Sequence, residues 1–255
     1  MQIKILGCSG GIGGKLRTTS ILLDDDILID AGSGVGDLSM DALMAINHVF
    51  ITHSHLDHVA FLPFLLDTVF GFRTKPITVY GCKATLEALR NHIFNWEIWP
   101  DFNAIPSVQA PFLQYQEIQV NETIALTGRT ITALPANHAV PALGYLLDSG
   151  KASLAFTGDT TVCDALWASV NNVKNLKYLI IETAFRNSEI ELAKLSKHLC
   201  PSMLADELSQ LASNNVEVYI THLKPGEGET IMQEIAEGRF QLNILALQHS
   251  QVFML

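Results

Sequence analysis

The segment His-Ser-His-Leu-Asp-His at positions 53–58 gathers three imidazoles and one carboxylate directly after an apolar run. A packed core has little use for this cluster, because each of these groups is costly to bury without a partner. Imidazole nitrogens and carboxylate oxygens are, however, ligands that zinc accepts. His53 and His55 project from one side of an extended segment, while Asp57 and His58 supply a second direction. The spacing predicts a loop that feeds two metal ions, and the alternative is an ordinary polar loop.

Two zinc ions need about three protein ligands each and a bridging group, so the loop predicts further ligands downstream. His138, Asp159 and His222 satisfy this expectation, because each follows a predicted strand. Taken singly, either histidine is an ordinary loop residue and the aspartate is a helix cap. Together with the first cluster they form a seven-residue set of nitrogen and oxygen donors, which predicts a two-metal centre.

The composition favours one folded domain over residues 1–255, because 48% of the residues are hydrophobic and 16% are charged. The formal net charge of -10 argues against nucleic acid as a partner, since no basic stripe is present to release counterions. The widely spaced cysteines, Cys8, Cys82, Cys163 and Cys200, predict buried free thiols in a reducing compartment.

The first residues run directly into a glycine-rich turn and lack the basic start, apolar stretch and cleavage site of a signal peptide. No segment approaches the roughly 20 uninterrupted apolar residues that cross a bilayer. We therefore expect a cytoplasmic protein that makes no membrane contact.

Alternation and apolar runs predict the elements that must position the ligands. Pro201 and a leucine stripe at i, i+4 and i+7 predict a helix over 201–212, and Ser188 followed by Glu191 resembles a capping box that opens a helix to about Lys197. Hairpins at the start, followed by strands that alternate with helices, indicate an α/β fold with sheets covered by helices on their outer faces. The expected strands are 2–6, 19–23, 27–30, 49–52, 77–80, 118–125, 130–134, 144–147, 153–157, 178–181, 216–220 and 244–247.

The turn at 7–15, Gly-Cys-Ser-Gly-Gly-Ile-Gly-Gly-Lys, follows the first strand and invites comparison with a nucleotide-binding loop. Ser9 stands where a Walker loop needs its first glycine, and Leu16 stands where it needs serine or threonine. The dinucleotide-binding pattern fails as well, because the required third glycine and following helix are missing. The turn is therefore predicted to be a flexible hairpin connection near the mouth of the site.

The segment 91–112 is rich in aromatic residues and prolines, so it cannot form one regular element. A long loop of this composition either packs as a satellite cluster or covers a binding site. Trp96, Trp99, Phe102 and His92 are accordingly the candidate substrate contacts, with core packing as the alternative for the aromatic rings.

The order of these motifs, His-x-His-x-Asp-His followed by His, Gly-Asp and Thr-His, resembles the metallo-β-lactamase superfamily over essentially the whole chain. The resemblance implies an α/β (α+β) fold, an αββα four-layer sandwich. It implies a first ion on His53, His55 and His138, a second ion on Asp57, His58 and His222, and a bridge through Asp159. Two Zn²⁺ ions are the implied cofactors, and these ligands also permit Mn²⁺ or Fe²⁺.

Further stretches are similar to the class II 3′,5′-cyclic-nucleotide phosphodiesterases. They are His-Ser-His-Leu-Asp-His-Val at 53–59, His-Ile-Phe-Asn leading to Ile-Trp-Pro-Asp within 92–101, Ser-Lys-His-Leu-Cys-Pro-Ser at 196–202 and Thr-His-Leu-Lys-Pro at 221–225. That family usually has Thr where Cys200 stands and a smaller residue pattern than Phe61-Leu62-Pro63 after the metal motif. The resemblance implies hydrolysis of cyclic AMP or cyclic GMP to nucleoside 5′-monophosphates, and a homodimer.

Two alternatives stand beside this function. Ile-Glu-Thr-Ala-Phe at 181–185, with His198 downstream, is similar to the transfer-RNA 3′-processing endonucleases, which are phosphodiesterases of the same superfamily. An RNA enzyme needs a basic surface and this acidic chain shows none, so the small cyclic nucleotide is the preferred substrate. A zinc-binding module without catalysis is disfavoured by the unbroken ligand set.

Cleavage of a phosphodiester leaves an alkoxide that needs a proton. We expect His198 to donate it, with Glu182 orienting the ring and keeping it cationic, because a neighbouring carboxylate raises the pKa of a histidine. Asp57, beside the metal ions, completes the catalytic set. The alternative for His198 is a histidine that only caps the backbone of a helix.

Overall fold

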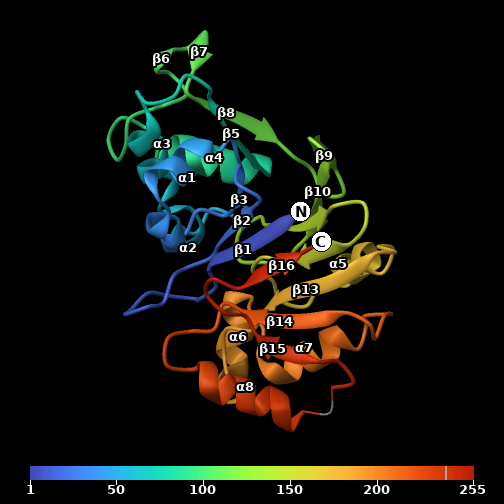
Figure 1. Cartoon of the computed structure of the whole chain (residues 1–255). Coiled ribbons are helices and arrows are strands. Elements are labelled where there is room, and N and C mark those ends of the chain that lie inside the picture. Colours follow the sequence, from blue (N-terminus) through green and yellow to red (C-terminus); the bar gives the residue numbers. More distant parts are fainter. Residues whose placement is uncertain (239) are drawn as a thin grey trace.

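Two seven-stranded β-sheets lie face to face in the computed structural model, which describes residues 1–238 and 240–255 (Figure 1). Sheet one has the order β16 (Val252–Met254), β1 (Gln2–Gly7), β2 (Ser20–Leu23), β3 (Ile27–Ile29), β4 (His48–Phe50), β5 (Ile77–Gly81) and β8 (Leu113–Glu117). Sheet two has the order β15 (Ile244–Ala246), β14 (Glu217–Thr221), β13 (Leu176–Glu182), β12 (Ser153–Phe156), β11 (Leu143–Asp148), β10 (Arg129–Pro135) and β9 (Thr123–Leu126). The last strand pairs antiparallel with the first, so the end of the chain completes the sheet that its start begins.

Helices cover the outer face of each sheet, which confirms the predicted αββα four-layer sandwich (Figure 1). Sheet one is covered by α1 (Met40–Ala45), α2 (Leu56–Val59), α3 (Leu62–Val69) and α4 (Lys83–His92). Sheet two is covered by α5 (Asp164–Val170), α6 (Ile190–Ser196), α7 (Pro201–Leu208) and α8 (Gly228–Glu237). The short elements are the 3₁₀ turns η1 (Ser33–Asp37) and η2 (Asn187–Glu189) and a hairpin of β6 (Pro106–Ser107) and β7 (Ala110–Pro111). Within the described residues, no helix has the length and apolar character needed to span a membrane.

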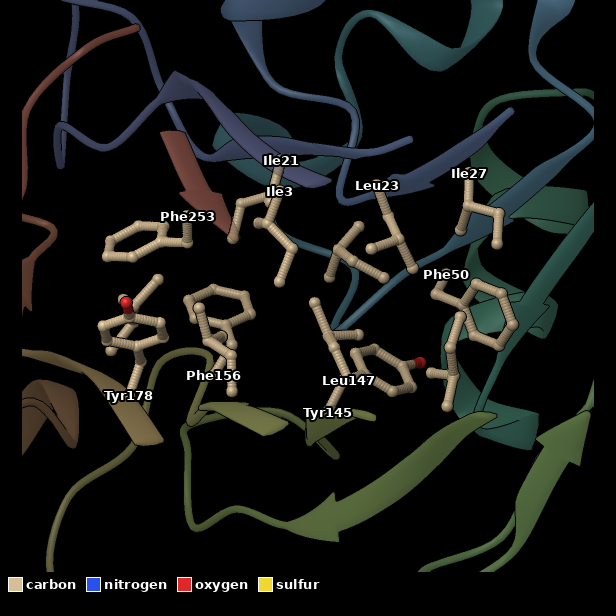
Figure 2. Packing of buried hydrophobic residues seen from close by; sticks show 14 of the residues in the cluster. Ile3, Ile21, Leu23, Ile27, Phe50, Tyr145, Leu147, Phe156, Tyr178 and Phe253 are labelled. Atoms are coloured by element: carbon tan, nitrogen blue, oxygen red, sulfur yellow. The ribbon is translucent and has the colours of Figure 1, made fainter. Parts of the chain in front are cut away.

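Large apolar side chains fill the space between the sheets (Figure 2). Val49 and Phe50 of β4 point to opposite faces, the first toward the helices and the second toward sheet two, as the period of a strand requires. The ring of Phe50 meets the edge of Tyr145 from β11, with ring centroids 5.5 Å apart. The Tyr145 hydroxyl donates a hydrogen bond of 2.8 Å to the carbonyl oxygen of Ile51. This contact fixes the start of the 53–58 loop to the opposite sheet.

The carboxyl ends of several parallel strands meet at one edge of the sandwich. β3, β4 and β5 run parallel in sheet one, and β12, β13 and β14 run parallel in sheet two. Segments that leave such strand ends are a common location for ligands. The strand ends of the two sheets are adjacent at this edge. His58, which follows β4, lies 3.3 Å from Asp159, which follows β12. The predicted ligands therefore leave strand ends that the fold has already brought together.

The predicted strand at 118–125 is wrong in its first half. The chain leaves β8 at Glu117 and enters β9 only at Thr123. Between them Asn121 has a positive φ of 66°, and the Glu122 carboxylate closes the turn by accepting a 2.9 Å hydrogen bond from a backbone amide. A local turn of this kind interrupts a run that otherwise has the composition of a strand.

The predicted helix starts and ends also need correction. Ser188 lies inside η2 and does not form a capping box, because α6 begins after Glu189, whose side chain makes no capping hydrogen bond. The backbone amide of Asn187 instead donates a 2.8 Å hydrogen bond to a glutamate of α8, so a tertiary contact sets this turn. The helix predicted over 201–212 ends as α7 at Leu208.

Candidate metal centre

The structure gathers all seven predicted metal ligands at the shared edge of the two sheets. In each of two groups, the possible ligand atoms lie within 4.8 Å of one another. The first group is His53, His55 and His138, and the second is Asp57, His58, Asp159 and His222. The loop at 53–58 contributes side chains to both groups, which is the division that its spacing predicts.

Asp159 lies between the two groups. Its Oδ2 atom is 3.9 Å from Nε2 of His53 and 3.3 Å from Nε2 of His58, and its Oδ1 atom is 3.3 Å from Nδ1 of His222. The preceding Gly158 has a φ of 62°, and a Cβ atom there would lie 2.8 Å from a backbone carbonyl oxygen of β11. Glycine thus allows the tight turn that aims Asp159 at both groups.

Two of the histidines are held on their far side by neighbouring side chains. Nδ1 of His53 is 3.0 Å from Oγ1 of Thr52, and Nδ1 of His58 is 2.7 Å from Oδ2 of Asp30. Asp30 is fully buried and also accepts a 2.8 Å hydrogen bond from the backbone amide of Thr52. Contacts of this type fix ring orientation and leave Nε2 directed at the metal position.

Backbone geometry holds two further ligands. Nδ1 of His138 donates a 3.0 Å hydrogen bond to the carbonyl oxygen of Lys197. A Cβ atom at Gly10 would lie 2.6 Å from the carbonyl oxygen of His222 and 2.9 Å from its ring carbon Cδ2, so only glycine fits against this ligand. The glycine-rich turn therefore packs directly on the metal centre.

Three non-glycine residues with positive φ belong to this site. Their φ angles are 58° for Asp30, 56° for Lys197 and 61° for His222. Such a conformation costs about 1–3 kcal/mol per residue and is concentrated at functional sites in proteins. Here each strained residue is a ligand or holds a ligand.

Burial keeps most of these imidazoles neutral. It lowers the pKa of His138 to about 4 and that of His222 to about 3, and it holds the pKa of His53 well below its usual range. Burial also opposes a charge on His58, but the two flanking carboxylates outweigh it and raise the pKa of that ring well above its usual range. A neutral imidazole has a nitrogen lone pair, so these rings can bind metal ions without first losing a proton.

Three buried histidine nitrogens at the centre make no hydrogen bond within the described residues: Nε2 of His53, Nε2 of His58 and Nδ1 of His222. An unpartnered buried polar atom costs about 1–3 kcal/mol, and these three atoms surround one carboxylate. Divalent cations that accept nitrogen and oxygen donors would satisfy all of them at once. The residues present therefore fit a pair of such ions.

His198 and Glu182 form a buried pair beside the centre. Nδ1 of His198 is 2.7 Å from Oε1 of Glu182, whose side chain is fully buried and also accepts hydrogen bonds from the backbone amides of Thr160 and Leu199. Burial opposes protonation of His198, but the Glu182 contact outweighs it and raises the pKa of the ring. Burial raises the pKa of Glu182 as well as opposing the charge on His198.

The position of His198 allows two roles. Its ring stacks on that of His222, with centroids 5.2 Å apart, and its ligand atom lies within 4.8 Å of those of His138 and Asp159. With Nδ1 held by the carboxylate, Nε2 is the atom that faces the centre. His198 can therefore deliver a proton there or add one more nitrogen donor.

Phe102 does not face the centre, contrary to its proposed role as a substrate contact. The ring is 1% exposed and packs against Phe70 and Phe112, at centroid distances of 5.3 and 6.1 Å. It has no free face for a base, so the alternative of core packing applies to this residue.

The other three predicted contacts lie nearer the surface. Trp99 is half-buried against Phe64, with ring centroids 5.2 Å apart, and its indole nitrogen has no partner within the described residues. Trp96 is 63% exposed. His92 is exposed at the end of α4. Among the described residues, no aromatic contact joins Trp96, Trp99 or His92 to the metal ligands, and their roles stay predictions.

Sequence reasoning missed the residues that hold ligands in place. Asp30 directly follows β3, and a carboxylate at the end of a buried strand could have signalled it. Thr52 ends the predicted strand at 49–52, and its position after an apolar run does not indicate a contact with a ligand. Lys197 acts through its backbone carbonyl oxygen, so its residue type carries no signal for this role.

The four cysteines are free thiols, and none belongs to the donor groups found among the described residues. Cys163 and Cys200 are buried as predicted, whereas Cys8 and Cys82 are half-buried. Their spacing thus indicated correctly that they form no disulfide.

Residues 26–249 match the family profile described as "Beta-lactamase superfamily domain". The chain is 30% identical to a 3′,5′-cyclic-nucleotide phosphodiesterase of Aliivibrio fischeri, over 86% of this chain and 80% of that protein. It is 26% identical to a "Probable 3′,5′-cyclic-nucleotide phosphodiesterase" of Yersinia pestis, over 97% of this chain and 85% of that protein. A ribonuclease Z of Methanococcus maripaludis is 33% identical over 59% of this chain and 50% of its own length.

The fold has a close counterpart among solved structures. Unliganded yeast PDE1 superimposes with a TM-score of 0.81 at 21% identity, over 100% of this chain and 99% of that chain. At this identity the likeness establishes the fold and leaves the activity to the site.

Proposed function

The chain belongs to the β-lactamase superfamily, and we propose that it is a metal-dependent phosphoric diester hydrolase that converts 3′,5′-cyclic nucleotides to nucleoside 5′-monophosphates. The observation that carries this proposal is the seven-donor cluster with Asp159 between its two groups. The two relatives named as cyclic-nucleotide phosphodiesterases, which this chain matches over most of its length, support the substrate class.

His53, His55 and His138 would hold one ion, Asp57, His58 and His222 would hold the other, and Asp159 would serve both. When bound, the ions supply an activated water nucleophile and offset the charge that grows on the phosphoryl oxygens. Zn²⁺ is the expected ion, and Mn²⁺ or Fe²⁺ suits the same donors. Asp30, Thr52 and Lys197 keep the ligand rings in place, so little rearrangement is needed on binding.

His198 is the proposed proton donor. In the reaction, water gives up a proton as its oxygen bonds to phosphorus, and the bond from phosphorus to the ribose 3′-oxygen breaks, so that the 3′-oxygen must receive a proton. Glu182 holds Nδ1 of His198 and raises the pKa of the ring, so Nε2 can carry that proton into the site. The ring is 7% exposed, which keeps bulk water from competing for the transfer.

The charge of the molecule favours a small substrate. A net charge of -10 opposes the approach of a long polyanion, while a cyclic nucleotide has a single negative charge that the metal ions attract. The competing function is cleavage of transfer-RNA precursors, and it is favoured by the Glu182–His198 pair and by the similarity to ribonuclease Z.

A turnover panel tests the proposal. Metal-loaded protein is incubated with cyclic AMP, cyclic GMP, bis(p-nitrophenyl) phosphate and a precursor transfer RNA, and products are resolved by chromatography. The proposal requires 5′-monophosphate from at least one cyclic nucleotide and an intact transfer RNA. Cleavage of the RNA with both cyclic nucleotides unchanged would assign the chain to RNA processing. No hydrolysis of any of the four would favour the non-catalytic zinc-binding module.

The expected homodimer and cytoplasmic location are separate predictions. Sedimentation equilibrium on the metal-loaded protein tests the first, with a mass of twice 28.0 kDa as the expected result. Fractionation of the source cells tests the second.

A further inference from the structure

A cavity of about 660 Å³ lies next to the backbone that carries His222, since its lining includes Cys8, which accepts a hydrogen bond from the His222 amide, and the next residue, Leu223. It is lined by the glycine-rich turn, the segment after β14 with the start of α8, and the segment that follows β15. Within the described part of the chain, none of the seven metal-donor residues lines it. A molecule in this cavity would therefore bind apart from the metal ions.

The charged lining of the cavity is mostly basic. Lys15, Arg17 and Lys224 line it, against one acidic residue of the described lining, Glu229. The three basic residues are among only 16 lysines and arginines in a chain of net charge -10. The Arg17 charge is offset by Asp37, to which Nε donates at 2.8 Å and Nη2 at 3.2 Å. The positive charge available to a ligand thus comes from two ammonium groups, Lys15 and Lys224, with Glu229 as the one opposing carboxylate of the described lining.

The remaining lining is largely apolar. Leu16, Leu247 and Pro225 contribute side chains, and burial raises the pKa of Cys8 to about 11, so its thiol stays neutral. A volume of this size is typical of sites for small organic ligands. Two cations beside an apolar wall suit an anion of about two charges attached to an apolar or planar group, and a phosphomonoester carries about that charge near neutral pH.

The wall of the cavity is also the support of a metal ligand. The backbone amide of His222 donates a 2.9 Å hydrogen bond to the carbonyl oxygen of Cys8, and the amide of Gly10 donates at 3.0 Å to that of Leu223. Nζ of Lys224 donates at 3.2 Å to the carbonyl oxygen of Gly10. An occupant that contacts this wall would brace the backbone behind His222.

We propose that this cavity is a second binding site, for an organic phosphomonoester of nucleotide size, with Lys15 and Lys224 facing the phosphate and the leucines facing the organic group. Its occupation orders the turn and the segment after β14, and through them it steadies His222. The site is independent of the proposed reaction, although a nucleoside 5′-monophosphate is a member of its ligand class.

Hydrogen exchange measured by mass spectrometry on the full-length, metal-loaded protein tests this site without any turnover. 5′-AMP is titrated, with adenosine and inorganic phosphate as separate arms. The expected result is slowed exchange at 223–229 and 246–251 that saturates with 5′-AMP, and much weaker protection from either part alone. Lys15 and Gln248 both line the cavity. In the double variant Lys15→Glu/Gln248→Glu, the concentration of 5′-AMP for half-protection should rise by about tenfold or more.

A matched control separates local from general charge effects. Lys174→Glu/Gln241→Glu makes the same change in net charge at exposed residues outside the cavity, and it should leave the titration unchanged. Absence of protection at 223–229 and 246–251, or protection that both double variants change equally, would overturn the proposal. Equal protection by adenosine and 5′-AMP would overturn the assignment of the phosphate. The hydrogen-exchange measurement does not depend on cyclic-nucleotide turnover. Either the proposed activity or the proposed second site can therefore fail while the other stands.

Discussion

The carbonyl oxygen of Lys197 accepts a 3.0 Å hydrogen bond from Nδ1 of His138, and it does so from a left-handed backbone conformation with a φ of 56°. Lys197 is the C-terminal cap of α6, so the end of this helix is turned to hold a metal ligand. The contact fixes the tautomer of His138 and leaves Nε2 to face the centre.

This relationship predicts different zinc affinities for two substitutions of Lys197. Lys197→Gly keeps the carbonyl oxygen and tolerates the positive φ, so zinc affinity should stay within about threefold of the wild type. Lys197→Val is strained at this φ and should weaken zinc binding by about 10–100-fold, the usual cost of losing an outer contact of a ligand. Competition with a fluorescent chelator measures both. Equal affinities in the two variants would remove the backbone of Lys197 from the support of the site.

Removal of the His198 ring should separate proton transfer from metal binding. His198→Ala is expected to lower kcat for cyclic AMP by about two to four orders of magnitude while two metal ions per chain remain bound. Glu182→Gln should lower kcat less, because it keeps the shape and weakens the hold on Nδ1. Elemental analysis beside the kinetics decides between the two roles of His198. Loss of one ion in His198→Ala would make the residue a ligand.

The aromatic segment predicts different consequences at its buried and exposed positions. Phe102→Ala should lower the free energy of unfolding by about 3–5 kcal/mol, because it leaves a cavity among Phe70 and Phe112. Trp96→Ala should leave stability unchanged, since the ring is 63% exposed, and raise KM for the cyclic nucleotide if it covers the base. Denaturant unfolding and steady-state kinetics are the measurements. An unchanged KM would exclude Trp96 from substrate binding.

An ion cluster between the two sheets predicts sensitivity to acid. Arg129 of β10 donates to Asp24 at 2.9 Å and to Asp26 at 2.7 Å, and both aspartates lie in the turn between β2 and β3. Burial opposes ionisation of Asp24, but hydrogen bonds from Gln2 and Arg129 outweigh it and lower the pKa of this carboxyl. The stabilisation is therefore complete above the unfolded pKa of about 3.9 and is lost as the pH falls through the lower folded value.

Arg129→Met should accordingly lower the free energy of unfolding by about 1–3 kcal/mol near pH 7, because both carboxylates lose a charged donor. The difference between variant and wild type should shrink below about pH 3.9. Urea unfolding at several pH values measures it, with Lys83→Met, which breaks an exposed pair at 3.9 Å, as a control that should change little. A difference that is constant with pH would show that the arginine contributes packing and no charge.

Much of the metal centre could be predicted from the sequence, because clustered histidines and aspartates are costly to bury unless metal ions bind them. The cluster at 53–58 and the polar residues after three apolar strands indicated both donor groups, and the structure places these residues together. The covering of the sheets by helices on their outer faces was accessible for a similar reason, since strands and helices carry their own periodicity, whereas the αββα layer order was implied by the family resemblance. In both cases the information lies in local sequence.

The remaining features depend on contacts that no local pattern contains. Lys197 supports His138 through a carbonyl oxygen that every residue type possesses. Phe102 and Trp96 belong to one aromatic segment, yet one is buried and the other exposed, because Phe70, after α3, and Phe112, before β8, cover only the ring of Phe102. Tertiary contacts determine such outcomes, and residue type does not.

Titration of metal-free protein with Zn²⁺, with cyclic AMP hydrolysis and bound metal recorded at each step, tests the two-metal phosphodiesterase most directly. We predict that release of 5′-AMP rises until about two equivalents are bound and falls again when a chelator removes them. Asp159→Asn should bind the ions more weakly and show little turnover at the same loading. Full turnover in the metal-free protein, or an intact substrate after both ions are bound, would contradict the account.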